Sequence, residues 1–151
     1  MKYRILLPAL LAALAIPAFV HADDDEAAEL KEQPAAVQKT AHEEVGKNEI
    51  EEVEPSYEEG QHATEVEYTE NGKKMAVVIA KDGNLIEKEH RMSPSEAPDA
   101  IQKAVAAFYP DAKITHLKEV TRKEATFFEI SVRGGGKSHQ LKLDASGNAV
   151  K

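Results

Sequence analysis

The sequence contains no cysteine and no tryptophan, and aromatic residues make up only 5% of its 151 positions. The absence of cysteine excludes disulfides, thiolate metal ligands, a cysteine nucleophile and a lipid-modified N-terminal cysteine. No second long apolar run follows residue 22, which excludes a multi-span membrane protein. Lysine and arginine number 19 against 27 acidic residues, and this net charge of −8 argues against general nucleic-acid binding. What remains is an acidic protein of one domain or two small ones, stabilised by packing alone.

Residues 1–22 have the pattern of a secretory signal peptide. Lys2 and Arg4 provide a positive start, an uncharged apolar run follows, and Val20-His21-Ala22 offers small residues at the cleavage positions. A retained membrane anchor is the alternative, but this run is short for a span of about 20 residues and contains two prolines. We therefore expect residues 1–22 to be removed and residues 23–29 to form an acidic linker. The mature protein, with a formal charge of −10, should be periplasmic or secreted without a stable membrane anchor.

The rest of the sequence aligns with itself, without a gap, when it is shifted by 64 residues. Helix positions match, and the turn pairs Gly72-Lys73 and Gly83-Asn84 fall on Gly136-Lys137 and Gly147-Asn148. Accidental similarity within a single domain is the alternative. Chance, however, does not readily keep turn glycines and strand apolar residues in phase. The pattern therefore predicts two tandem copies, residues 30–92 and 93–151.

Each copy is expected to contain one helix followed by four strands. In the second copy a helix begins after Pro98, presents an apolar stripe that includes Phe108, and ends before Pro110. In the first copy the helix follows Pro34 and stops at Gly46. Alternating apolar residues predict strands at 113–120, 126–133 and 137–144 and a short strand around Val150, with matching strands in the first copy. The predicted fold class is α+β: two tandem repeats, each with one helix packed on a four-stranded antiparallel β-sheet.

One strand is expected to be irregular. Ile114 and Leu117 stand three residues apart, so a regular strand cannot place both side chains on the same face. A β-bulge between them would restore the apolar face.

The order of helix, Tyr109-Pro110, two strands, glycine-rich turn, third strand and Ser146-Gly147-Asn148 resembles that of the PepSY-like domains, also called β-lactamase-inhibitor-like domains. The resemblance covers the second copy fully and the first copy more loosely. It implies an exported bacterial α+β module whose exposed sheet face binds or inhibits another protein, such as a peptidase, and it implies no catalytic residue. In the β-lactamase inhibitor proteins themselves each repeat carries a disulfide and two helices, whereas this sequence lacks cysteine and predicts one helix per copy.

Groups that could carry chemistry are sparse. Five histidines remain after residue 22, and no two stand at the i, i+4 spacing of a helical metal site. Asp82-Gly83-Asn84 and residues 144–148 partly match a calcium loop but lack its closing glutamate, and hairpin turns account for them. We therefore expect no catalytic residue, no bound metal and no cofactor. The alternative function is a periplasmic metal or calcium-binding protein, and a third hypothesis is an enzyme whose site is assembled across the repeats.

The sheet face away from the helices is the expected binding surface. Strand alternation places six candidate binding residues there: Phe127, Glu129, Lys142, Glu65, Glu67 and Val78. Since Phe127 and Phe128 are adjacent, one of them must point away from the helix, where it either anchors a protein partner or packs against the other copy. The sequence thus predicts a non-enzymatic module that binds an envelope protein or peptide and no nucleic acid.

Overall fold

The computed structural model describes residues 25–150, so the predicted signal peptide lies outside the described residues. The helices are α1 (Asp25–Glu32), α2 (Ala35–Val45) and α3 (Asp99–Phe108), with a 3₁₀ turn at Pro94–Glu96. The strands are β1 (Ile50–Glu58), β2 (Gln61–Glu70), β3 (Lys73–Ala80), β4 (Leu85–Met92), β5 (Lys113–Arg122), β6 (Ala125–Gly134) and β7 (Lys137–Asp144). No described helix is long and apolar enough to cross a membrane.

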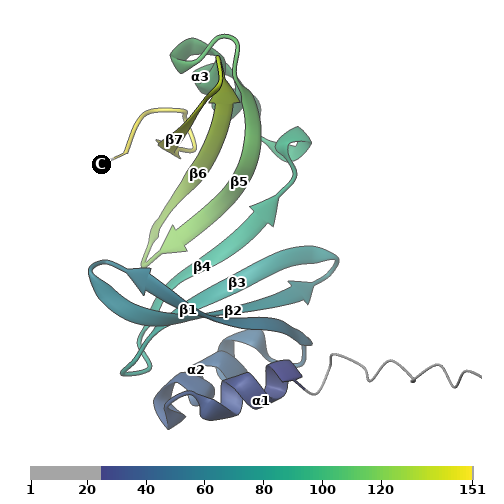
Figure 1. Cartoon of the computed structure of the whole chain (residues 1–151), viewed down its shortest axis with the longest axis vertical. Coiled ribbons are helices and arrows are strands. Elements are labelled where there is room, and N and C mark those ends of the chain that lie inside the picture. The colour runs from purple at the N-terminus through teal and green to yellow at the C-terminus, as the bar shows by residue number, and fades with distance from the viewer. Residues whose placement is uncertain (1–24, 151) are drawn as a thin grey trace, which may run out of the picture.

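All seven strands form one antiparallel sheet in the order β1-β2-β3-β4-β5-β6-β7 (Figure 1). The prediction of two four-stranded sheets, each with its own helix, is therefore wrong. β4 pairs with β5 from Lys88↔Thr121 to Met92↔Leu117, because the open edge of β4 satisfies its backbone groups on β5. The strand expected around Val150 is only an isolated bridge between Leu143 and Ala149.

Most individual elements lie where the sequence predicts them. α2 ends immediately before Gly46, and α3 ends immediately before Tyr109-Pro110. The expected bulge in β5 is confirmed, since the β5–β6 register shifts between Ile114 and His116. α1 was not predicted, and it includes residues 25–29 of the segment expected to form an acidic linker.

The helices cover one face of the sheet and form two apolar cores there. α1 and α2 lie against β1–β3, and α3 lies against β5–β7 (Figure 1). The first core gathers Val37, Ala41 and Val45 of α2 with strand residues such as Val66 and Val77. In the second core Ile101 and Val105 of α3 meet Phe128, Ile130, Val132 and Leu143. Phe108, expected in the α3 stripe, is instead 51% exposed.

The opposite face of the sheet is curled inward, and we call it the concave face. Ala76, Val78 and Val120 are buried on it. At the end of β5, Arg122 forms ion pairs with Glu58 and Glu59 at the β1–β2 turn, although three other strands separate β5 from β1. The curl therefore brings the end of the β1–β2 hairpin and the end of the β5–β6 hairpin together over this face.

Candidate functional site

The concave face carries a groove of about 730 Å³ that crosses β4, β5, β6 and β7. Its walls include charged side chains of both signs: Glu65, Glu89, Arg91, Lys118, Glu129 and Lys142. Three further polar residues, one from each of three strands, line the same groove: His116, Ser131 and Gln140. We call this feature the concave groove.

Strand register arranges the groove side chains in rows across the sheet. Arg91 lies opposite Lys118, Lys118 opposite Glu129, and Glu129 opposite Lys142. A neighbouring row runs through Glu89, Val120 and Phe127. Because side chains alternate along each strand, both rows point to the face opposite the helices. Residues distant in sequence thus become direct cross-strand neighbours.

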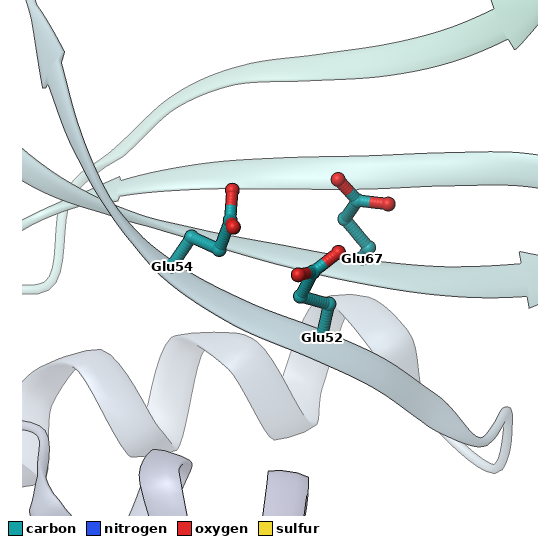
Figure 2. Close-up of side chains that lie close together, drawn as sticks. All are labelled: Glu52, Glu54 and Glu67. Carbon is teal, nitrogen blue, oxygen red and sulfur yellow. The ribbon is translucent and has the colours of Figure 1, made fainter.

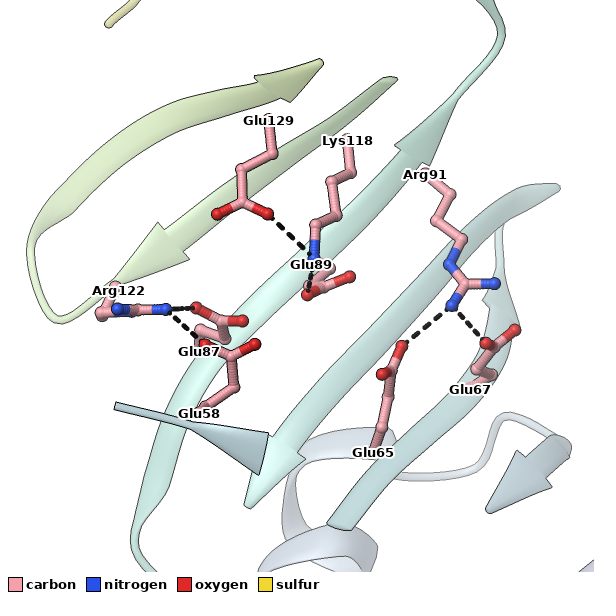
Figure 3. Close-up of polar contacts among 9 residues, drawn as sticks. All are labelled: Glu58, Glu65, Glu67, Glu87, Glu89, Arg91, Lys118, Arg122 and Glu129. Carbon is pink, nitrogen blue, oxygen red and sulfur yellow. Dashed lines mark hydrogen bonds and ion pairs between the residues drawn. The ribbon is translucent and has the colours of Figure 1, made fainter. Parts of the chain in front are cut away.

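Lys118 joins two glutamates at the centre of the groove (Figure 3). Its Nζ lies 2.5 Å from Glu89 and 3.2 Å from Glu129. Burial raises the pKa of Glu89 to about 7, against the hydrogen bond and charge of Lys118, which favour the carboxylate. Burial alone would lower the pKa of Lys118, but the hydrogen bond to Glu89 and the charges of Glu89 and Glu129 outweigh it and raise that pKa. Lys118 is therefore a fixed cation, while Glu89 changes charge near neutral pH.

Arg122 forms a second ionic cluster beside the groove (Figure 3). Its Nε donates to Glu87 at 2.9 Å, and its terminal nitrogens lie 3.1 Å from Glu58 and 3.1 Å from Glu59. Glu87 is 2% exposed, so this guanidinium supplies the charge that a buried carboxylate requires. The cluster ties the β1–β2 and β5–β6 hairpins to β4.

Arg91 is held between Glu65 and Glu67 of β2, and its guanidinium lies 2.9 Å from Glu65 (Figure 3). Burial raises the pKa of Glu67, and the charge of Arg91 opposes this shift. Two of the predicted binding residues therefore belong to an ion pair that orients the arginine.

The six predicted binding residues all lie on the concave face, but they are not equally accessible. Phe127 is 5% exposed and Val78 is 1% exposed, so neither offers a free surface to a partner. The Nζ of Lys142 lies 3.8 Å from the centroid of the Phe127 ring, and the Arg122 guanidinium carbon lies 5.8 Å from it. Phe127 therefore packs beneath two cations instead of standing out as an exposed anchor.

Sequence reasoning missed five residues of these clusters: Glu87, Glu89, Arg91, Lys118 and Arg122. All five occupy alternating positions of β4 and β5, where the sequence pattern indicates solvent-exposed charge. The sequence signal that could have found them is the match between the glutamates of β4 and the basic residues of β5. This match indicates ion pairs only once β4 and β5 are known to pair.

Three carboxylates gather outside the groove, on β1 and β2 (Figure 2). Ligand oxygens of Glu52, Glu54 and Glu67 lie within 4.8 Å of one another. The charge of Glu52 and its hydrogen bond raise the pKa of Glu54. Because Arg91 already pairs with Glu67, the cluster is explained by charge on the sheet face and does not by itself assign a metal.

The two turns that partly match a calcium loop use their aspartates internally. Asp144 Oδ1 accepts the backbone N–H groups of Ser146 at 2.8 Å and Asn148 at 2.9 Å. Asp82 Oδ1 accepts the N–H of Asn84 at 3.0 Å. Both arrangements are side-chain-stabilised turns, which account for these residues without a cation.

No family model and no curated protein matches the sequence. Solved structures resemble the fold at low identity. A Bacteroides eggerthii protein, described provisionally as periplasmic, aligns with a TM-score of 0.64 at 18% identity over 79% of this chain and 86% of its own. A DUF2874 family protein from Bacteroides ovatus gives 0.63 at 18% identity over 79% and 85%. A BLIP-like protein from Bacteroides fragilis gives 0.59 at 15% identity over 79% and 84%.

These likenesses concern the fold. None of the three descriptions names an enzymatic activity. The PepSY-like resemblance and the tandem duplication stay predictions from the sequence, whereas the predicted periplasmic location agrees with the description of the B. eggerthii neighbour. The chain therefore has the fold of the BLIP-like and DUF2874 proteins of Bacteroides.

Proposed function

We propose that this periplasmic protein is a non-enzymatic module that binds an envelope protein or peptide in the concave groove. The observation that carries the proposal is the groove itself, about 730 Å³ of open space on the sheet face that no helix covers. Lys118 and Arg91 are already held by carboxylates there, so a ligand meets charged groups in fixed positions. Such preorganisation lowers the entropy lost on binding.

Inhibition of a peptidase or another envelope enzyme is the specific form of binding that we propose. The BLIP-like description of the B. fragilis neighbour and the resemblance to inhibitor-like domains support it. The groove offers side chains of both charge signs and a row of further polar residues, which suits the mixed polar surface of a protein better than a small apolar ligand.

Capture of the partner by the tagged mature chain in its own envelope, followed by mass spectrometry, tests the proposal. Ser131→Arg introduces bulk and charge into the groove without removing a residue of the ionic clusters. Ser95→Arg is the matched control, because Ser95 is exposed and lies outside the groove. We expect Ser131→Arg to lose a partner that the wild type and Ser95→Arg retain. Equal retention by both variants contradicts binding in the groove.

A further inference from the structure

The sheet has two edges, and they differ in their capacity to accept another strand. β1 contains Pro55, shows a register shift between Ile50 and Glu52, and contacts α1. A proline, a bulge and a covering helix are the features that block strand addition at an edge. β7 contains no proline and pairs with β6 without a register shift. The β7 edge is therefore the more open of the two.

Hydrogen bonds of the C-terminal turn show which β7 residues face outward. On the side away from β6, the Lys142 carbonyl accepts the N–H of Val150 at 2.9 Å, and the Asp144 N–H donates to Asn148 at 2.8 Å. Backbone groups of an antiparallel strand alternate between its two sides. The N–H and C=O groups of Ser138 and Gln140 therefore also point outward. Within residues 25–150, no backbone hydrogen bond joins either residue to a segment beyond the sheet.

The charges along this edge indicate which segment would fit. β7 carries Lys137 and Lys142 in a protein with a net charge of −8. Lys142 has no ion-pair partner among the described residues, because Glu129, which lies opposite it, contacts Lys118 instead. Val150 occupies the position directly beside Lys142, so an added strand pairs with Ser138 and Gln140. An acidic side chain opposite Gln140 would then lie diagonal to Lys142, within reach of its long side chain.

We infer that β7 accepts an extended acidic peptide segment of the partner as an eighth strand. The inference rests on the proposed function and specifies how the partner enters the concave groove. Backbone hydrogen bonds to Ser138 and Gln140 supply affinity, and an aspartate or glutamate opposite Gln140, diagonal to Lys142, supplies selectivity. A second copy of the chain fits less well, because pairing β7 with β7 brings together basic strands of two acidic molecules.

The probe is a labelled nine-residue peptide of alternating glutamate and valine, titrated into the mature protein by fluorescence anisotropy. A peptide with lysine in place of glutamate tests the charge. The same acidic peptide with alternate backbone amides N-methylated tests the strand hydrogen bonds. We expect both control peptides to bind at least tenfold more weakly than the acidic probe. Equal affinity of either control overturns the inference.

Protein variants locate the site. Gln140→Pro removes one outward N–H and leaves the β6–β7 hydrogen bonds in place, whereas Gln140→Ala removes only the side chain. We expect a loss of at least tenfold for Gln140→Pro and less than twofold for Gln140→Ala, with amide exchange slowed at Ser138 and Gln140 when the probe binds. If Gln140→Pro does not fold, strand addition is tested on the wild type by the N-methylated peptide and by amide exchange at Ser138 and Gln140.

The captured partner separates this inference from the proposed function. A partner lost from Ser131→Arg but kept by Gln140→Pro overturns strand addition and leaves groove binding intact. A partner kept by both variants overturns the proposed function. Dimerisation through β7, detected by light scattering and abolished by Gln140→Pro, overturns the acidic-peptide assignment in favour of a second copy.

Discussion

Glu89 is the residue through which pH acts most directly on the concave groove. Its carboxylate is 2% exposed and bonds to Lys118, while the negative charge of Glu65 and a hydrogen bond with Glu87 favour its protonated form. Burial raises its folded pKa to about 7 from an ordinary value of 4.5, so the folded state binds a proton more tightly than the unfolded chain between these values. The contribution of Glu89 to the free energy of unfolding is therefore most favourable below pH 4.5 and is lost as the pH rises through about 7.

Glu89→Gln should remove this pH dependence. We expect the free energy of unfolding of the wild type to fall by about 2–3 kcal/mol more than that of the variant between pH 5 and pH 8. Urea unfolding at four pH values measures both slopes. Glu124→Gln, in the exposed β5–β6 turn, is the control and should keep the wild-type slope. Parallel curves for all three proteins contradict the assignment of the titration to Glu89.

Phe127 stabilises the fold even though it lies on the proposed binding face. Because its ring is 5% exposed, Phe127→Ala should lower the free energy of unfolding by about 3 kcal/mol. Phe108→Ala is a matched control, since that ring is 51% exposed and should cost less than about 1 kcal/mol. Chemical denaturation of the two variants compares them directly. Similar losses would mean that the concave face does not enclose Phe127.

Hairpin ends are the elements that set the curl of the sheet. Arg122 at the start of the β5–β6 turn forms ion pairs with Glu58 and Glu59 at the β1–β2 turn, and Glu87 on β4 anchors the same guanidinium. Glu59 and Lys123, one in each turn, adopt positive φ angles of 51° and 56°, which non-glycine residues rarely do. The turns therefore hold a specific backbone shape at the place where the ionic cluster joins them.

Arg122→Ala should destabilise the protein by about 2–4 kcal/mol, because it leaves Glu87 buried without a cation. Arg133→Ala, at an exposed arginine on β6, should change stability by less than about 0.5 kcal/mol. Thermal unfolding compares the two variants. The double variant Arg122→Met/Glu87→Leu should recover most of the loss, since an apolar pair needs no charge compensation. Failure of this rescue would contradict an electrostatic origin of the loss.

The sequence predicted single elements well, because their signals are local. Pro34, Gly46 and Pro110 mark helix ends by their own backbone restrictions. The face assignment of Glu65 and Glu129 follows from strand alternation alone. α1 escaped prediction because residues 25–32 are mostly charged, and its only buried described side chain is Leu30.

At the scale of the whole molecule, sheet continuity could not be predicted because it depends on residues far apart in the sequence. Because Glu87 and Glu89 are acidic, β4 has the pattern of an exposed edge strand when the chain is divided into two separate repeats. Their burial becomes favourable only through Lys118 and Arg122 of β5, which the sequence places about 30 residues later. The groove could not be predicted for the same reason, since its rows of side chains depend on the pairing of β4 with β5.

A single sheet predicts that the molecule unfolds as one unit. Splitting the chain after Met92 would expose Lys118 and Val120 on β5 and leave Glu87 and Glu89 of β4 without their cations. Both halves therefore depend on the β4–β5 ladder, and we expect one calorimetric transition whose van't Hoff and calorimetric enthalpies agree. Val120→Lys should lower the midpoint of the entire transition, because it places a charge at a fully buried position of the ladder. Two transitions, with only the later half shifted by Val120→Lys, would show that the halves are separate folding units joined by a weak seam.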